Sequence, residues 1–78
     1  MEKKTLKQDD DIKIINNKIL GEKIRNYRKR KKLSLEDLAK QMGISKLSIQ
    51  KYEVGKRTIP FNILVDFFKI LEIPLGRV

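Results

Sequence analysis

Two short predicted helices joined by a tight turn constrain the fold of this chain most strongly. Ser34 and Asp37 have the spacing of a capping box, with an acid one carbon shorter than the usual Glu, and predict a helix over 35–42. This helix stops at the tripeptide Gly43-Ile44-Ser45, whose serine can cap a second helix over 46–54. With so short a connection, the two helices must pack against each other at a sharp angle.

The residue types at this turn each have a mechanical reason. Gly43 tolerates the left-handed backbone conformation that reverses the chain, Ile44 can fill the corner, and the small Ala39 lets the second helix approach the first. Gly55 can end the second helix, because a positive φ costs glycine nothing. The spacing is that of a helix-turn-helix inside an all-α domain.

A further helix is predicted on each side of this pair. Before it, Asn17 can cap a helix whose apolar residues recur one turn apart and which ends near Lys32; these residues are Leu20, Ile24 and Tyr27. After it, Pro60 suits the first turn of another helix. Most residues of that last segment are apolar, but its polar residues recur at helical spacing, which favours a helix over a strand; these are Asn62, Asp66 and Lys69.

The first residues differ in composition from the rest. We interpret residues 1–16 as an N-terminal arm, ordered in part or packed on the domain or on a partner, and residues 17–78 as the domain. The isoleucines of the arm allow two readings. Alternation at 12 and 14 suggests a short strand, whereas the spacing of 12, 15 and 19 suggests a helical turn. The segment is too short to decide between them.

Composition excludes several classes of function. The 78 residues are enough for one domain, and they include no Cys and no His. Disulfides, thiol nucleophiles, imidazole catalysis and structural zinc are therefore excluded, and we expect no metal and no cofactor. No paired carboxylates or phosphate-binding glycine motif suggest an enzyme. No apolar run approaches membrane-spanning length, so we expect no membrane contact and a cytoplasmic, nucleoid-associated location.

The charge is strongly positive and unevenly distributed. The net charge is +9, and residues 20–59 contain twelve Lys or Arg and four acids, so nearly all of the excess lies there. Such a basic segment is typical of a polyanion-binding domain, with nucleic acid favoured over an anionic membrane. The alternative interpretation is a solvated cationic face without a recognition role.

The predicted helix over 46–54 has two different faces. Ile49 and Tyr52 fall on the inner face, and a polar face with some apolar residues falls opposite them: Leu47, Gln50, Lys51 and Val54. Lysine amines can meet guanine acceptors in a major groove, and a leucine can touch a thymine methyl group. The alternative is an amphipathic surface helix of a small bundle.

Residues 20–60, "LGEKIRNYRKRKKLSLEDLAKQMGISKLSIQKYEVGKRTIP", resemble the lambda-repressor-like helix-turn-helix family, also called the Cro/xenobiotic-response-element family. The likeness continues more loosely to Ile73. It implies a compact domain of four or five helices, here with an N-terminal extension. It also implies binding of a palindromic double-stranded DNA operator by a homodimer, with the second helix of the motif in the major groove.

The resemblance assigns roles to individual residues. Base contacts fall on Lys46, Leu47, Ser48 and Lys51. Contacts to the DNA backbone fall on Ser34, Leu35, Ser45, Gln50, Lys56, Arg57 and Thr58. Leu35 departs from the family, which often has Gln or Thr there, so a side-chain bond to phosphate is lost. The resemblance also implies a partly buried ion pair between Arg28 and Glu53.

A second departure concerns dimerisation. Family members commonly add a fifth helix that forms the dimer, but only five residues follow Ile73 here, so that helix is missing or the chain has been cut. If other residues of the last helix fill the core, Ile63 and Ile70 lie on a flank that something should cover. Ile12 and Ile15 of the arm are candidates for this contact, in the same chain or in a partner.

The leading interpretation is a sequence-specific DNA-binding transcriptional regulator, and we expect a repressor of phage, mobile-element or bacterial type. The alternative is a protein-interaction module, an antitoxin or adaptor that uses the same fold. The cations on the 46–54 helix favour DNA, because a protein-binding helix would be expected to show aromatic or Met anchors on its outer face.

Overall fold

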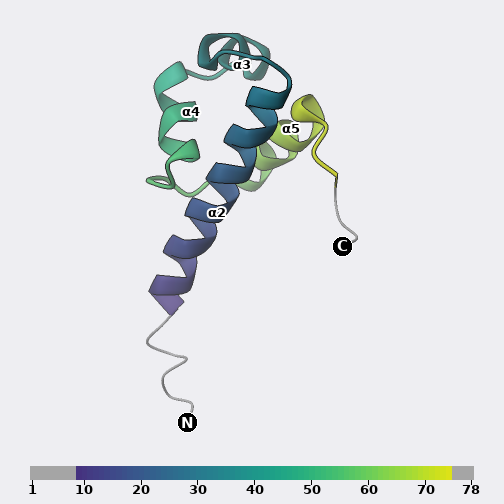
Figure 1. Ribbon diagram of the computed structural model, residues 1–78. Helices are drawn as coiled ribbons and strands as arrows, with labels where there is room; N and C mark the ends of the chain where they lie inside the picture. The colour runs from purple at the N-terminus through teal and green to yellow at the C-terminus, as the bar shows by residue number, and fades with distance from the viewer. Residues whose placement is uncertain (1–8, 75–78) are drawn as a thin grey trace.

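The chain folds into four α-helices in the part that its computed structural model describes, residues 9–74, with side chains described from residue 16 onward. The helices, labelled as in Figure 1, are α2 (Asp9–Arg30), α3 (Leu35–Met42), α4 (Lys46–Glu53) and α5 (Phe61–Leu71). The described residues contain no strand, and the predicted all-α class is confirmed.

The core lies where α2, α3, α4 and α5 meet. α2 packs on α4 and α5, and α3 packs on the same two helices, so α4 and α5 are each held from two sides. The rings of Tyr52 and Phe67 meet edge to face, with centroids 6.0 Å apart. The buried apolar residues are Ile24, Leu38, Ala39, Ile49, Tyr52, Ile59, Phe67, Leu71 and Ile73.

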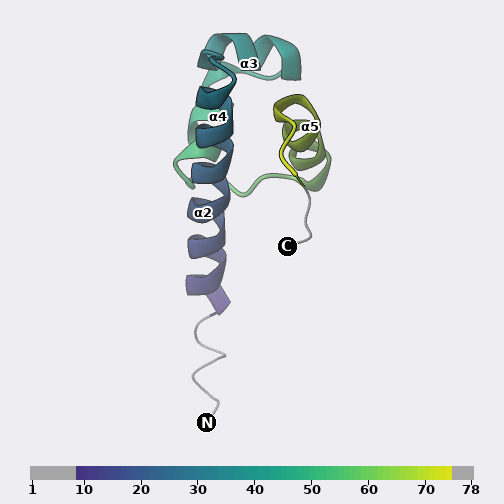
Figure 2. The same cartoon turned by 45° about the vertical axis from the view of Figure 1, so that its right-hand side comes forward.

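The first helix is longer than predicted. α2 begins at Asp9, so the expected start at Asn17 is wrong, and 12–15 are helical rather than extended. Asn17 does not cap a helix; its Nδ2 donates a hydrogen bond to Oγ1 of Thr58, 3.1 Å away. The N-terminal turns of α2 project beyond the other helices in both views (Figures 1 and 2).

The caps of α3 and α4 agree with the sequence predictions. Ser34 and Asp37 form the capping box of α3, and Gly43 ends that helix with φ 70°. Ser45 caps α4 through a hydrogen bond that its side chain accepts from the Ser48 N–H. Gly55 follows α4 with φ 80°, which is the left-handed conformation expected of it.

The last helix packs against the core over a wider face than the sequence predicts. Pro60 precedes α5 as its N-cap instead of occupying its first turn. Ile63 and Ile70 are half-buried against the domain's own core, so the flank expected to lack cover is covered in part within the chain. The exposed apolar residue is Phe61, which is 79% exposed. The side chains of Ile12 and Ile15 lie outside the described residues.

None of the helices from α2 to α5 is long and apolar enough to span a membrane. Between residues 9 and 74, no group of three or more acidic, His or Cys residues is placed to hold a metal ion.

Candidate nucleic-acid interface

The outer face of α4 is the exposed side of the helix-turn-helix. Ile49 is fully buried and Tyr52 is 6% exposed, so these two residues fix the inner face of the helix in the core. On the outer face, Leu47 is 57% exposed and Lys46 is also exposed, while Lys51 is half-buried. The helix therefore presents two cations and an apolar side chain to solvent.

A small network organises the N-terminus of α4. Oγ of Ser45 accepts a hydrogen bond from the Ser48 N–H at 3.1 Å and lies 3.0 Å from Oγ of Ser48. Nη1 of Arg57 donates to the same Ser48 hydroxyl at 3.3 Å. The Arg57 guanidinium also lies 5.8 Å from the ring centroid of Tyr52. Ser48, a predicted base contact, thus shares its hydroxyl with the helix cap and with Arg57.

The N-terminus of α3 is closed by its capping box. The Ser34 N–H donates to Oδ2 of Asp37 at 3.2 Å, and the Asp37 N–H donates to Oγ of Ser34 at 2.9 Å. The bond from the Ser34 N–H to the carboxylate is the main cause that lowers the pKa of Asp37 from its ordinary value, and the Ser34 side chain adds to the effect. The box uses the N–H groups of Ser34 and Asp37, so the early N–H groups at Leu35 and Glu36 remain directed out of the helix start, where an anion can be bound.

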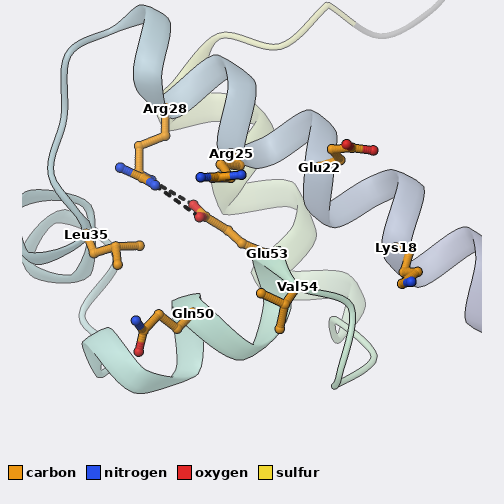
Figure 3. A pocket seen from close by; sticks show the side chains of 8 residues that line it. All are labelled: Lys18, Glu22, Arg25, Arg28, Leu35, Gln50, Glu53 and Val54. Carbon is orange, nitrogen blue, oxygen red and sulfur yellow. Dashed lines mark hydrogen bonds and ion pairs between the residues drawn. The ribbon is translucent and has the colours of Figure 1, made fainter.

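A buried ion pair connects the first and the third helix of the domain. Nε of Arg28 lies 2.7 Å from Oε2 of Glu53, and Nη2 of Arg28 lies 3.1 Å from Oε1 of the same carboxylate. Nη1 of Arg28 donates to the carbonyl oxygen of Leu33 at 2.9 Å. Figure 3 shows the two side chains facing each other between α2 and α4. One guanidinium therefore holds α2, α4 and the α2–α3 connection together.

A groove of about 470 Å³ opens above this ion pair. Residues of α2, α3 and α4 line it: Lys18, Glu22, Arg25, Arg28, Leu35, Gln50, Glu53 and Val54. Gln50 and Val54 belong to the outer side of α4, so the groove borders the exposed face described above (Figure 3). Leu35 at the start of α3 contributes an apolar wall.

Gly21 is a structural residue that the sequence reasoning missed. A Cβ atom at this position would lie 2.3 Å from the carbonyl oxygen of Tyr52 and 2.5 Å from that of Glu53. The backbone of α2 therefore passes directly over the last turn of α4, and only glycine allows this approach. The available signal was a glycine inside a helical pattern, which often marks close packing.

The loop after α4 contains the remaining predicted contacts. Lys56, Arg57 and Thr58 are exposed. The Lys56 N–H donates to the carbonyl oxygen of Lys51 at 2.9 Å, which holds the start of the loop on the helix. The Thr58 hydroxyl accepts the bond from Asn17, which ties the loop to α2. The structure thus brings the predicted loop residues to the C-terminal end of α4 and Leu35, at the start of α3, to the groove.

Comparisons with known proteins agree with this architecture. A Helix-turn-helix family model matches residues 24–78. An uncharacterized transcriptional regulator in the ATPase CF(0) region of Rhodospirillum rubrum is 38% identical over 56 residues, covering 72% of this chain and 52% of that protein. The HTH-type transcriptional regulator YqaE of Bacillus subtilis, also uncharacterized, is 30% identical over 57 residues, covering 73% of this chain and 49% of that protein.

These relatives are longer than this chain. A relative from Pyrococcus furiosus is 31% identical over 60 residues, which are 77% of this chain but 19% of that protein. The chain therefore spans between about a fifth and about half of the curated relatives it matches. No solved structure matches the chain. The family match and the geometry of the two capped helices lead to the same conclusion: the chain belongs to the lambda-repressor-like helix-turn-helix family.

Proposed function

We propose that this chain is a sequence-specific, double-stranded-DNA-binding transcriptional regulator that inserts α4 into the major groove. The observation that carries the proposal is the outer face of α4, where Lys46 and Leu47 are exposed beside Lys51 on a helix anchored by its buried inner face. A helix held in this way can enter a groove of B-form DNA without rearrangement of the domain.

The chemistry of this face suits base recognition. The amines of Lys46 and Lys51 can donate to guanine O6 and N7, and Leu47 can contact a thymine methyl group. We assign Ser48 a smaller contribution to base recognition, because its hydroxyl already contacts Ser45 and Arg57.

The surrounding residues suit contacts to phosphate. The helix start at Ser34 and Leu35 offers backbone N–H groups, and Lys56 and Arg57 offer cations. The Thr58 hydroxyl accepts from Asn17, so its own O–H is left as a donor. Ser45 and Gln50 complete the proposed set beside α4.

We further infer that the protein acts as a homodimer on a palindromic operator, as a repressor of phage, mobile-element or bacterial type in the cytoplasm, without enzymatic activity. Operator symmetry follows from a two-fold dimer, because each copy then reads one half-site and the half-sites lie about 34 Å apart.

The second candidate function is a protein-interaction module. An apolar groove of about 470 Å³ on α5 favours it, lined by Phe61, Leu64, Val65, Phe68, Lys69 and Ile73. The outer face of α4 favours DNA, since it exposes lysine and glutamine side chains in place of aromatic anchors.

Selection of bound duplexes from a random DNA pool tests the proposal, followed by titration of the selected site at several salt concentrations. We expect a defined motif and a steep salt dependence, because each phosphate contact adds about 0.9 to the log-log slope. A flat salt response and an unselected pool would reject DNA reading and favour the protein-interaction module.

A further inference from the structure

Two exposed cations of α2 lie on the side of this helix that borders α4. Lys18 and Arg25 both line the groove above the buried ion pair, together with Gln50 and Val54 of α4 (Figure 3). The two cations are seven positions apart, which places them on one face of the helix about two turns from each other. The α2 side of the groove therefore carries positive charge at two points along its length.

Lys18 is held against the loop that follows α4. A Cβ atom on Gly55 would lie 2.8 Å from Cγ of Lys18, so the stem of this lysine packs directly on the loop backbone. The preceding residue, Asn17, donates its hydrogen bond to the hydroxyl of Thr58, three residues further along the same loop. These two contacts fix this turn of α2 beside the loop that contains the proposed phosphate contacts.

The charges that line the groove do not balance. Arg28 and Glu53 neutralise each other through their two hydrogen bonds. Among the side chains that the structure describes, neither Lys18 nor Arg25 has an ion-pair partner. Glu22 is the acid of the lining that opposes them, so two cations face one acid. A negatively charged partner is the kind that this surface fits.

We propose that Lys18 and Arg25 bind phosphates of the DNA strand that runs beside α4 when this helix lies in the major groove. A helix with its side chains is about 10–12 Å across and the major groove is about 12 Å wide, so the strand passes directly along the side of the helix. The groove opens on that side, because Gln50 and Val54 line it and also belong to the outer side of α4.

This surface extends the domain that the family shares. The family model begins at residue 24, whereas Lys18 lies on the part of α2 that precedes the match. Phosphates carry no base sequence, so these contacts should strengthen binding to any duplex without changing which bases are preferred. The early turns of α2 thus add affinity to the sequence preference that α4 supplies.

The inference rests on the proposed insertion of α4, and its test uses two matched pairs of variants of the full chain. Lys18→Gln is paired with Lys23→Gln. Arg25→Gln is paired with Arg30→Gln. Each control lies five residues further along α2, which turns it about 140° around the helix and away from the groove lining. Both control residues are exposed, and their cations lie 6.0 Å and 4.7 Å from the ring centroid of Tyr27.

Binding of each variant is measured over a range of salt concentrations, on the duplex selected from the random pool and on a mixed-sequence duplex. Lys18→Gln and Arg25→Gln should each weaken binding to both duplexes at least about threefold and lower the slope of log affinity against log salt concentration by about 0.9. Each control should change the affinity by less than about twofold and leave the slope unchanged. Thermal melts establish that all four variants fold.

Glu22→Gln should produce a gain of binding, which damage to the fold cannot imitate. This variant removes the acid that opposes the phosphates, so it should tighten binding to both duplexes about twofold to threefold. Equal effects of the groove variants and their controls, or no tightening by Glu22→Gln, would overturn the α2 surface and leave base reading by α4 standing. A wild type that binds neither duplex would overturn both proposals.

Discussion

The two faces of α4 are held in different ways. On the inner face, Ile49 is fully buried, and Glu53 is fixed by two hydrogen bonds from Arg28 beneath the close approach of Gly21. On the outer face, Leu47 and Val54 are more than half exposed. One short helix therefore has a face that is part of the core and a face that contributes little to it.

This difference separates stability from recognition on a single element. Substitutions on the inner face should lower the free energy of unfolding and disturb DNA binding only through loss of the fold. Substitutions on the outer face should leave the free energy of unfolding unchanged and alter DNA binding directly.

The largest expected effect concerns the buried ion pair. Arg28→Ala or Glu53→Ala should lower the free energy of unfolding by about 3–5 kcal/mol, because each leaves an unpaired buried charge. The double variant should lower the free energy of unfolding by less than the sum of the two single losses. Urea denaturation of the three variants measures this. Losses below about 0.5 kcal/mol in both single variants would mean that the pair does not hold α2 on α4.

Gly21→Ala should have the next largest effect. The added methyl group meets the carbonyl oxygens of Tyr52 and Glu53, so α2 must move away from α4 at a cost of about 1–3 kcal/mol. Glu22→Ala is the matched control at the next, exposed position and should change the free energy of unfolding by less than about 0.5 kcal/mol. A stabilised Gly21→Ala variant would show that the helices do not touch there.

The cap of α3 should have the smallest effect on stability. Ser34→Ala removes the side chain that accepts the Asp37 N–H and should cost about 1 kcal/mol. Asp37→Asn tests the charge. Because folding lowers the Asp37 pKa, its ionised form stabilises the fold above the ordinary carboxyl pKa, and this contribution is lost as the pH falls through the lowered pKa. Thermal melts should therefore give the wild type a higher melting temperature than Asp37→Asn at neutral pH, and this difference should disappear in acid.

Much of the helix-turn-helix could be predicted from the sequence because its boundaries are set locally. The capping box at Ser34 and the glycines at 43 and 55 act on their own backbone, so their residue types predict the ends of α3 and α4 directly. The two faces of α4 follow from helical periodicity, since Ile49 and Tyr52 are the residues that reach the core.

The errors arose where a distant residue decides the role of a local one. Asn17 is a good capping residue in isolation, but its partner is Thr58, 41 positions away. Gly21 lies in an ordinary helical segment, and only the position of α4 explains it. The partial cover of Ile63 and Ile70 on α5 also depends on distant residues, because the domain's own core packs against them. The proposed DNA contacts depend in the same way on a partner outside the chain.

The central claim is that the outer face of α4 reads bases, and Lys51 tests it most directly. Binding of the wild type, Lys51→Ala and Arg57→Ala is measured on a selected site and on the same site with one base pair changed. Lys51→Ala should weaken the free energy of binding to the matched site by about 1–3 kcal/mol and that to the mismatched site only a little. The free energy of unfolding should be unchanged. Arg57→Ala is the control. It should weaken binding to both sites alike and lower the slope of log affinity against log salt concentration by about one. Equal weakening of both sites by Lys51→Ala would contradict base reading by this face.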